Sequence, residues 1–327
     1  QSRTWLGNAS KDLDTGRQDT SPAACSFFWA FAPQRRQAPF ERAPECRFSL
    51  EACQLKADTI MMKNPPELAV FTGLDGTLLD HTTYRWDAAQ PALDRLAALG
   101  IPVILASSKT ASEMTYLRDQ MALTQYPAIV ENGSGVIGLD GQDMTDRYAV
   151  LRDTLDGLPG SLRRLFRGFG DMTVDEVALL TGLPPDAAQR AKTRMFSEPG
   201  DWSGDANMLN AFRTVLAEHG VTAQQGGRFL TLSFGTTKAD AMVQIIKAIT
   251  PAKTLALGDA PNDIAMLEQA DHGVIVANPH RAPLPKIAGE ADGRIMRTTD
   301  PGPQGWNTAV HAFLDARGLK TGSKLYG

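Results

Sequence analysis

The chain has 327 residues, of which 43% are hydrophobic and 21% are charged. This composition is ordinary for a globular protein, and the length allows one large or two medium domains. A net charge of −4 argues against a broad surface for nucleic acids or anionic membranes. No uninterrupted apolar segment approaches the ~18 residues that a membrane-spanning helix needs. We therefore expect neither nucleic acid nor membrane as a partner, and the sequence leaves the oligomeric state open.

All three cysteines, Cys25, Cys46 and Cys53, lie in the first sixty residues. Their spacing matches neither a CxxC pair nor a set of metal ligands, so we expect no thiol nucleophile and no zinc site. A reducing cytoplasm fits this pattern, and we expect the protein to be cytoplasmic.

The first sixty residues also lack a helical period. Their apolar run from Ala23 to Ala32 loosely resembles an export signal, but three aspartates precede it and Pro33-Gln34-Arg35-Arg36 follows it. We expect residues 1–62 to be a disordered or non-native extension, with Met61 or Met62 as the natural start.

The rest of the chain is organised around the stretch from Leu68 to Thr77. Its apolar run from Leu68 to Phe71 is short enough for a buried parallel strand. The run ends in Gly73-Leu74-Asp75-Gly76-Thr77, which places a carboxylate and a glycine turn at the carboxyl end of the strand. In open α/β sheets, ligands bind at that edge.

Apolar strands and helices then alternate, which predicts an α/β fold with a doubly wound parallel sheet. Thr110 and Glu113 form a capping box at the start of one of these helices. The expected strands cover 101–106, 128–131, 253–257 and 272–277, with a possible one at 294–297, and the expected helices cover 87–99, 110–121, 238–249, a segment after Pro261, and 305–317.

Between these parts the alternation lapses. Short helices are expected at 175–181 and 185–193 and a longer one at 206–219, with strands at 195–198, 221–225 and 228–233. We therefore predict a smaller α+β cap domain over 148–232, inserted between core segments 66–147 and 233–318.

The segment from Gly133 to Gly138 matches the G-x-G-x-x-G fingerprint of dinucleotide-binding proteins. That fingerprint requires a helix directly after it, so that the helix N-terminus meets the pyrophosphate. Here Leu139-Asp140-Gly141 follows, which is typical of a hairpin turn. We therefore expect a glycine-rich hairpin and reject a dehydrogenase.

Polar side chains follow four of the expected strands, so they should meet at one edge of the sheet. They include two or three carboxylates, which favour Mg²⁺, together with hydroxyl and ammonium groups that can hold phosphoryl oxygens. Taken singly, each has an ordinary alternative, such as a helix cap or a solvated surface lysine. The set consists of Asp75, of Ser107 with Lys109, of Lys238, and of Asp259 with Asn262 and Asp263.

These residues resemble the motifs of the haloacid dehalogenase superfamily. The Gly73-to-Thr77 loop is similar to motif I, Asp-x-Asp-Gly-Thr, while Ser107, Lys238 and the run from Gly258 to Asp263 are similar to motifs II, III and IV. Within the superfamily, the chain from Leu68 to about Arg317 resembles the mannosyl-3-phosphoglycerate phosphatase family. The more specific markers are Ser107-Ser108-Lys109-Thr110 with Glu113-Met114, Glu131-Asn132-Gly133, Gln225-Gly226-Gly227-Arg228-Phe229, and the segment from Asp300 to Trp306.

The resemblance implies Mg²⁺-dependent hydrolysis of 2-O-mannosyl-3-phosphoglycerate, a small phosphorylated sugar-glycerate, to mannosylglycerate and phosphate. It implies that Asp75 acts as acid and base and that Ser107 and Lys238 bind the phosphoryl group. Mg²⁺ would be held by Asp75, through its backbone carbonyl, and by Asp259, supported by Asn262 and Asp263. Substrate contacts are expected from Ser108, Lys109, Arg228, Arg194 and Glu198, although surface charges on cap strands are an equal alternative for the last three.

Gly73 departs from the family pattern, because the first Asp of motif I is the nucleophile that accepts the phosphoryl group. Glycine has no side chain for this role, neither Thr72 nor Leu74 can replace it, and Asp75 is committed to acid–base work. Three hypotheses remain: a phosphatase of this family that has lost its nucleophile, a non-catalytic sugar-phosphate binder, and a phosphatase with broader sugar-phosphate scope.

Overall fold

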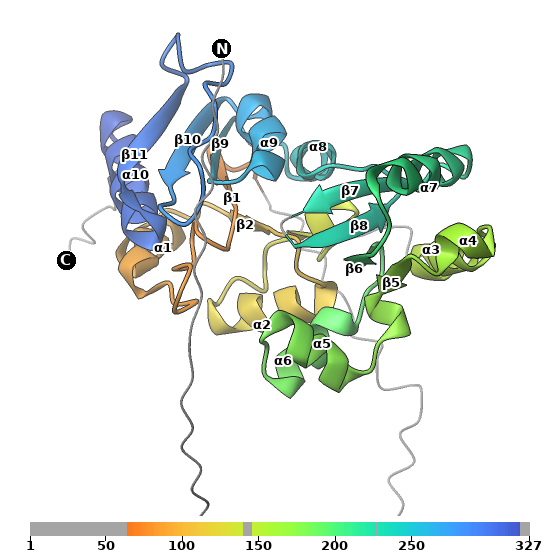
Figure 1. The fold of residues 1–327 in the computed structure, drawn as a ribbon. Coiled ribbons are helices and arrows are strands. Elements are labelled where there is room, and N and C mark those ends of the chain that lie inside the picture. Colours follow the sequence, from red (N-terminus) through yellow and green to blue (C-terminus); the bar gives the residue numbers. More distant parts are fainter. Residues whose placement is uncertain (1–63, 140–145, 227, 321–327) are drawn as a thin grey trace, which may run out of the picture. The chain divides into compact units, whose positions relative to one another are not determined.

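The computed structural model describes residues 64–139, 146–226 and 228–320 (Figure 1). The expectations for residues 1–62, and the turn at Asp140 and Gly141, lie outside these ranges. The described residues form a seven-stranded sheet and a separate four-stranded sheet. Both sheets belong to one compact unit of the chain.

The larger sheet confirms the doubly wound α/β prediction. Its strands lie in the order β11-β10-β9-β1-β2-β3-β4, and neighbours are parallel except for β4, which pairs antiparallel with β3 at the edge. β1 therefore lies between β9 and β2, where the strand order reverses. The strands are β1 (Leu68–Thr72), β2 (Val103–Ala106), β3 (Ala128–Val130), β4 (Gly135–Ile137), β9 (Lys253–Gly258), β10 (His272–Ala277) and β11 (Ile295–Pro301).

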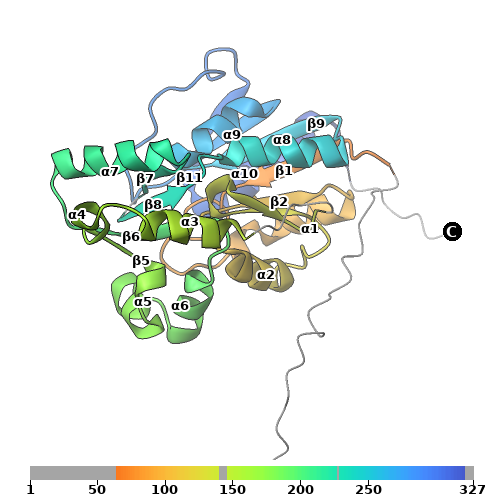
Figure 2. The ribbon, with the colours of Figure 1, turned by 90° about the vertical axis from the view of Figure 1, so that its right-hand side faces the viewer.

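Both faces of this sheet are covered, which explains its continuous apolar strands. In β1, Leu68 and Val70 face one buried cluster, whereas Ala69 and Phe71 face the other. The first cluster is completed by α1 (Gln90–Ala98), α2 (Ala111–Gln120) and α10 (Gly302–Ala316), and the second by α8 (Lys238–Ile249) and α9 (Ile264–Gln269). Figure 2 shows α8 and α9 on the opposite side of the sheet from α1 and α2.

The smaller sheet is antiparallel, with the order β5-β6-β8-β7. It has its own buried cluster, which includes Leu151, Phe166, Phe212 and Leu230. We call the elements from α3 to β8 the cap segment, and the domain boundaries proposed from the sequence stay a prediction. The cap segment contains α3 (Arg147–Asp156), α4 (Gly160–Arg163), β5 (Phe166–Gly168), α5 (Val174–Thr181), α6 (Pro185–Lys192), β6 (Glu198–Trp202), α7 (Ala206–Glu218), β7 (Thr222–Gly226) and β8 (Phe229–Ser233).

The prediction of a strand over 195–198 is wrong, because β6 begins only at Glu198. Met195 and Phe196 instead pack against the buried cluster of the larger sheet. The ring of Phe196 lies directly over Gly135, where an added Cβ would be 2.3 Å from it. This contact draws the chain out of a strand conformation before β6 starts.

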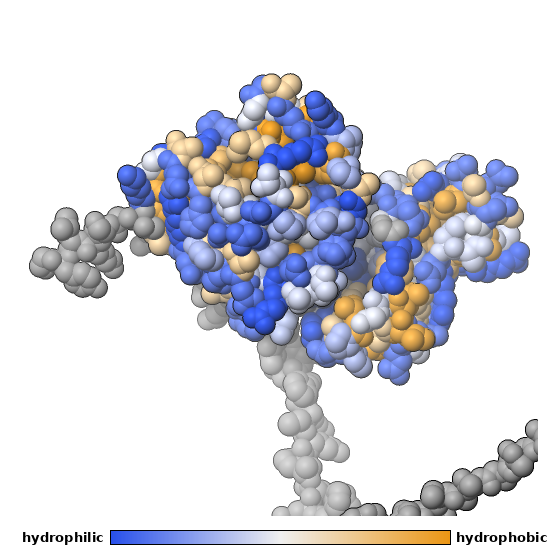
Figure 3. Space-filling model, turned by 60° about the vertical axis from the view of Figure 1, so that its left-hand side comes forward, coloured by the Kyte–Doolittle hydropathy of each residue, from blue (hydrophilic) through white to orange (hydrophobic). Residues whose placement is uncertain are grey.

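The surface seen in Figure 3 is mostly hydrophilic, with smaller hydrophobic areas between the polar side chains. Leu179 on α5 is the most exposed of the large hydrophobic side chains described, at 88%. No helix within the described ranges combines the length and the apolar character that crossing a membrane requires.

Candidate active site

The carboxyl ends of β1, β2 and β9 meet at a cavity of about 570 Å³ that the cap segment also lines. The site residues predicted from the sequence lie in its wall, with one exception. Those that line it are Asp75, Ser107, Ser108, Lys109, Arg194, Arg228, Lys238, Asp259, Asn262 and Asp263, and Gly73 lies there too.

Glu198 is the exception, because the structure does not bring it to this cavity. Its side chain is 0% exposed and lies within the cap segment. The carboxylate accepts hydrogen bonds from the Tyr148 hydroxyl (2.8 Å), the Arg152 guanidinium (2.9 Å) and the Gly170 amide (2.7 Å). Burial raises the pKa of Glu198 despite these donors. Glu198 therefore contributes to the interior of the cap segment.

Asp75 follows β1 and forms an ion pair with Lys109, whose Nζ lies 3.0 Å from Asp75 Oδ1. Burial lowers the pKa of the Lys109 ammonium, but the charges of Asp75 and Glu113 raise it by more, so this pKa lies above its usual value. The pair joins the ends of β1 and β2 and leaves Asp75 37% exposed at the cavity.

Asp259, at the end of β9, is buried and held on both oxygens. The Thr77 hydroxyl donates to its Oδ1 (2.5 Å) and the Asn278 amide donates to its Oδ2 (2.7 Å). Arg281 lies 3.6 Å from the same Oδ2. Burial raises the pKa of Asp259, and the nearby charge of Asp263 adds to this effect.

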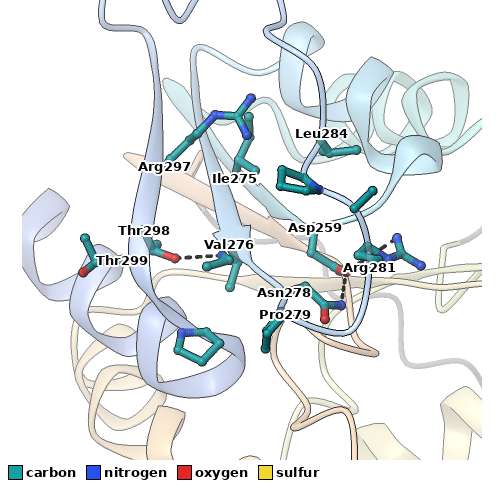
Figure 4. Close-up of a pocket in the computed structure, with 14 residues that line it drawn as sticks. Asp259, Ile275, Val276, Asn278, Pro279, Arg281, Leu284, Arg297, Thr298 and Thr299 are labelled. Carbon is teal, nitrogen blue, oxygen red and sulfur yellow. Dashed lines mark hydrogen bonds and ion pairs between the residues drawn. The ribbon is translucent and has the colours of Figure 1, made fainter.

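Asp259 also lines a second cavity, whose volume is about 360 Å³. Figure 4 shows the residues that form its wall. This wall is formed by β10, by β11 and by the chain that follows β10, from which Asn278 and Arg281 reach Asp259. Asp259 and Arg281 line both cavities, so they form part of the wall between them.

Lys238 and Ser107 are buried beside the cavity, with 5% and 3% exposure. Lys238 Nζ donates to Asp263 Oδ1 (2.7 Å), while Asp263 Oδ2 accepts from the amides of Asp259 and Ala260 (3.1 Å each). Asp263 therefore fixes both the ammonium of Lys238 and the loop that carries Asp259. Because Lys238 is the first residue of α8, its backbone N–H also lies at a helix N-terminus.

The cap segment contributes two guanidinium groups to the cavity. Arg194 lies next to Glu131 (3.2 Å) and donates to the Ser197 hydroxyl (2.6 Å). Arg228 donates to the carbonyls of Leu180 (3.1 Å) and Thr181 (3.2 Å) at the end of α5. Both groups are thus held in place by contacts with the protein.

Four residues of the site had no role assigned from the sequence: Thr77, Glu131, Asn132 and Asn278. Thr77 and Asn278 hold Asp259, and Asn132 accepts a hydrogen bond from Asn262 (2.8 Å). All four follow β3 or β10 or lie in the loop after β1, so their position at the carboxyl edge of the sheet was the signal that could have found them. Only the long-range contacts of Glu131 had no such signal.

The backbone at position 73 does not require glycine. An added Cβ would lie 3.1 Å from Thr77 Oγ1 and 3.4 Å from Asp263 Oδ2, contacts that small movements can relieve. Gly73 does not have a positive φ angle, and its N–H donates to the Leu257 carbonyl (2.8 Å). Gly73 lines the cavity, so a side chain at this position would begin at the cavity wall, beside Thr77 and Asp263.

The donor atoms around the cavity fit a hard cation such as Mg²⁺. The available ligands are oxygens, and Mg²⁺ in phosphate-handling sites commonly takes one or two carboxylates, with phosphate and water completing its shell. At the cavity, Asp259 can supply a carboxylate and Asp75 its backbone carbonyl. In the described part of the chain, no three His, Cys, Asp or Glu side chains are grouped as a metal site. An Asp at position 73 would add the missing carboxylate.

Comparison with known proteins agrees with this geometry. A family model described as haloacid dehalogenase-like hydrolase matches residues 70–156 and 200–285. The glucosyl-3-phosphoglycerate/mannosyl-3-phosphoglycerate phosphatase of Persephonella marina is 31% identical over 270 residues, which is 76% of this chain and 97% of that protein.

Solved structures with the same fold include a haloacid dehalogenase-like hydrolase from Bacteroides thetaiotaomicron, at a TM-score of 0.53 and 18% identity over 76% of this chain and 99% of that one. The sucrose-phosphatase of Synechocystis sp. PCC6803, solved with sucrose and phosphate, has a TM-score of 0.51 and 17% identity over 76% of this chain and 98% of that one. The chain therefore belongs to the haloacid dehalogenase-like hydrolases, in the family of the Persephonella marina phosphatase.

Proposed function

We propose that this protein is a phosphatase of the mannosyl-3-phosphoglycerate type, which releases phosphate from 2-O-mannosyl-3-phosphoglycerate to give mannosylglycerate. The observation that carries the proposal is the meeting of Ser107, Lys238 and Asp259 at one cavity that the cap segment also lines. The name and 31% identity of the Persephonella marina protein support the substrate class. The cysteine pattern of the sequence, with neither a CxxC pair nor a metal-ligand spacing, fits a cytoplasmic reaction.

Each core residue has a defined task in this proposal. Lys238, held by Asp263, and the Ser107 hydroxyl bind phosphoryl oxygens, whose charge must be neutralised in the transition state. With a carboxylate at position 73 to accept the phosphoryl group, as in Gly73→Asp, Asp75 would protonate the leaving glycerate oxygen and then take a proton from the water that hydrolyses the acyl phosphate. Lys109, whose Nζ lies 3.0 Å from Asp75 Oδ1, holds that carboxyl group in place at the cavity.

Mg²⁺ is the proposed cofactor, with Asp259 and Asp75 as its ligands, and when bound it would neutralise charge on the phosphoryl oxygens. Asn262 and Asp263 support this site through their hydrogen bonds to Asn132 and to the Asp259 loop. The proposed contacts for the sugar and glycerate groups are Arg194 and Arg228 on the cap segment, together with Ser108 after β2.

Gly73 favours a second candidate function for the chain as it stands. It retains the phosphate-binding residues and lacks the acceptor of the phosphoryl group, which suits a sugar-phosphate binder without turnover. Losing a catalytic nucleophile lowers turnover by roughly 10⁴–10⁶-fold. The two functions are therefore separated by turnover and not by binding.

The test is Mg²⁺-dependent phosphate release from 2-O-mannosyl-3-phosphoglycerate by the chain as written and by Gly73→Asp. We expect Gly73→Asp to be faster by a factor on the order of 10⁴ or more. Gly73→Asn serves as the matched control, because it has a similar shape without a nucleophilic carboxylate, and it should stay as slow as the chain as written.

Equal turnover of all three proteins would refute the assignment of position 73 to the nucleophile. If Gly73→Asp hydrolyses simple sugar phosphates but not the mannosyl substrate, the substrate assignment fails and a broader sugar phosphatase is the better description. A glucosyl substrate in the same panel resolves the choice of sugar.

A further inference from the structure

The turn that follows β3, from Glu131 to Gly133, has an unusual backbone. All three residues have positive φ angles, 48° at Glu131, 59° at Asn132 and 96° at Gly133. This left-handed conformation is unfavourable for residues other than glycine and persists only where surrounding contacts hold it. Strain of this kind often marks a functional position.

The side chain of Glu131 leaves the larger sheet and binds the cap segment. Its Oε1 accepts from the Met195 amide (3.0 Å), and its Oε2 accepts from the Phe196 amide (3.2 Å) and the Ser197 hydroxyl (2.7 Å). Arg194 NH2 lies 3.2 Å from the same Oε2. Glu131 is 1% exposed, so these four contacts form without competition from water.

The backbone of the same turn holds the phosphate-binding strand ends. The Glu131 amide donates to the Lys109 carbonyl and the Asn132 amide to the Ser107 carbonyl, each at 2.9 Å. The Asn132 side chain accepts from Asn262 (2.8 Å).

At Gly133, an added Cβ would lie 2.1 Å from the backbone of Thr237, which directly precedes Lys238. The turn therefore contacts the loops that carry Ser107, Lys238 and Asn262 as well as the cap segment.

We propose that Glu131 is a positioning residue that fixes the cap segment to the phosphate-binding loops and holds Arg194 at the substrate cavity. The inference rests on the proposed function, because it assigns Arg194 a substrate contact. A carboxylate is needed at this position because four donors converge on its two oxygens. In Glu131→Gln, the amide NH₂ would face at least one of these donors, and the contact would become repulsive.

The first test measures kinetics in the Gly73→Asp background with two substrates. For Glu131→Gln we expect KM for 2-O-mannosyl-3-phosphoglycerate to rise about tenfold, which corresponds to about 1.4 kcal/mol of lost binding. Turnover of p-nitrophenyl phosphate, which has no sugar or glycerate for Arg194 to contact, should change by less than about twofold. Ser197→Ala removes one donor to the same carboxylate and should give a smaller change in the same direction.

The matched control is Asp171→Asn, which removes a carboxylate whose partners, Arg152 and Arg163, lie within the cap segment. It should leave the ratio of the two activities unchanged. An equal loss on both substrates in Glu131→Gln would overturn the inference, and so would an unchanged KM.

A second measurement does not depend on turnover. In the chain as written, hydrogen exchange of the Met195 and Phe196 amides should speed up about tenfold in Glu131→Gln but not in Asp171→Asn. Equal exchange in the two variants would show that Glu131 does not hold this segment. If Gly73→Asp hydrolyses neither substrate, the proposed function fails while the exchange experiment still decides the role of Glu131.

Discussion

Gly73 and Gly76 lie three residues apart in the loop after β1, but their backbones have opposite requirements. Gly76 has a φ angle of +81°, and an added Cβ would lie 2.4 Å from the Asn278 amide that holds Asp259. Gly73 has neither restriction. In this loop, position 73 can accept a side chain, whereas position 76 requires glycine. This matches the motif Asp-x-Asp-Gly-Thr, which has aspartate at the position of Gly73 and glycine at the position of Gly76.

These differences predict that substitution by alanine has a small effect on stability at position 73 and a large one at position 76. Gly73→Ala should change the free energy of unfolding by less than about 1 kcal/mol, since a non-glycine residue also restricts the unfolded chain. Gly76→Ala should cost about 2 kcal/mol or more, because it combines a left-handed backbone with a steric clash. Urea denaturation of both variants tests this, and equal stabilities would contradict our account of the loop.

Asp171 shows how a paired carboxylate makes stability depend on pH. Burial raises its pKa, but hydrogen bonds from Arg152 and Arg163 outweigh burial and lower it from 3.8 to about 2. A lowered pKa in the folded state stabilises the fold above the unfolded pKa, and this contribution is lost as pH falls toward 2.

We therefore expect Asp171→Asn to lose no more than about 1 kcal/mol of stability at pH 7, because solvent screens this partly exposed pair, and to show less change between pH 4 and pH 2 than the parent chain. Chemical denaturation across this pH range measures the difference. A constant difference between the two proteins from pH 7 to pH 2 would show that Asp171 does not contribute through its charge.

At the level of elements, the larger sheet was predictable because its strands are short apolar runs and its helices carry local signals. The Thr110–Glu113 capping box, for example, is present as predicted at the start of α2. α3, α4 and β5 were not predicted, since Arg147–Asp156 contains only two fully buried side chains and β5 only three residues. Their positions depend on packing against α7 and β6, which no local pattern reveals.

The closing helix α10 illustrates a motif whose role became clear only in three dimensions. Trp306 is fully buried, and its Nε1 donates to the Thr72 hydroxyl (2.9 Å), which in turn donates to the Gly73 carbonyl (2.8 Å). Trp306 thus links α10 through Thr72 to Gly73.

Trp306→Phe should reduce stability by about 2–4 kcal/mol, because it removes this hydrogen bond and leaves a small cavity in the core. In the Gly73→Asp background it should also lower kcat more than it raises KM, since it loosens the peptide that carries residue 73. Thermal unfolding and steady-state kinetics measure the two effects, and an unchanged stability would argue against the role of the Trp306–Thr72 bond.

For the whole molecule, the meeting of the site residues at one edge followed from the parallel topology alone. The position of Arg194 did not, because it depends on the contacts of Glu131 with residues more than sixty positions later in the chain. Glu198 shows the reverse case, in which a charged residue on a predicted cap strand lies inside the cap segment instead of at the cavity. Sequence patterns could place the core residues at one edge of the sheet but could not predict the orientation of cap side chains.

Because the residues proposed to bind phosphate are all present, we expect the chain as written still to bind ligand. Inorganic phosphate with Mg²⁺ should stabilise it against unfolding, by about 2.7 kcal/mol at a hundred times the dissociation constant. Ser107→Ala should reduce this stabilisation, whereas Ser161→Ala, on the exposed surface of α4, should not. Thermal unfolding with and without the ligands tests this, and the absence of any shift would argue against both candidate functions.

The cap segment begins after β4 and ends before α8, outside the strands of the larger sheet. Another cap could therefore replace it in evolution without interrupting that sheet. The anchoring of Met195–Ser197 by Glu131 sets a condition on such an exchange. A replacement cap must contain backbone N–H groups that donate to the Glu131 carboxylate, as those of Met195 and Phe196 do. Otherwise Glu131 must be substituted at the same time. Chimeras between members of this family should therefore inherit the cap's substrate preference only when Glu131 and its partner segment come from the same parent.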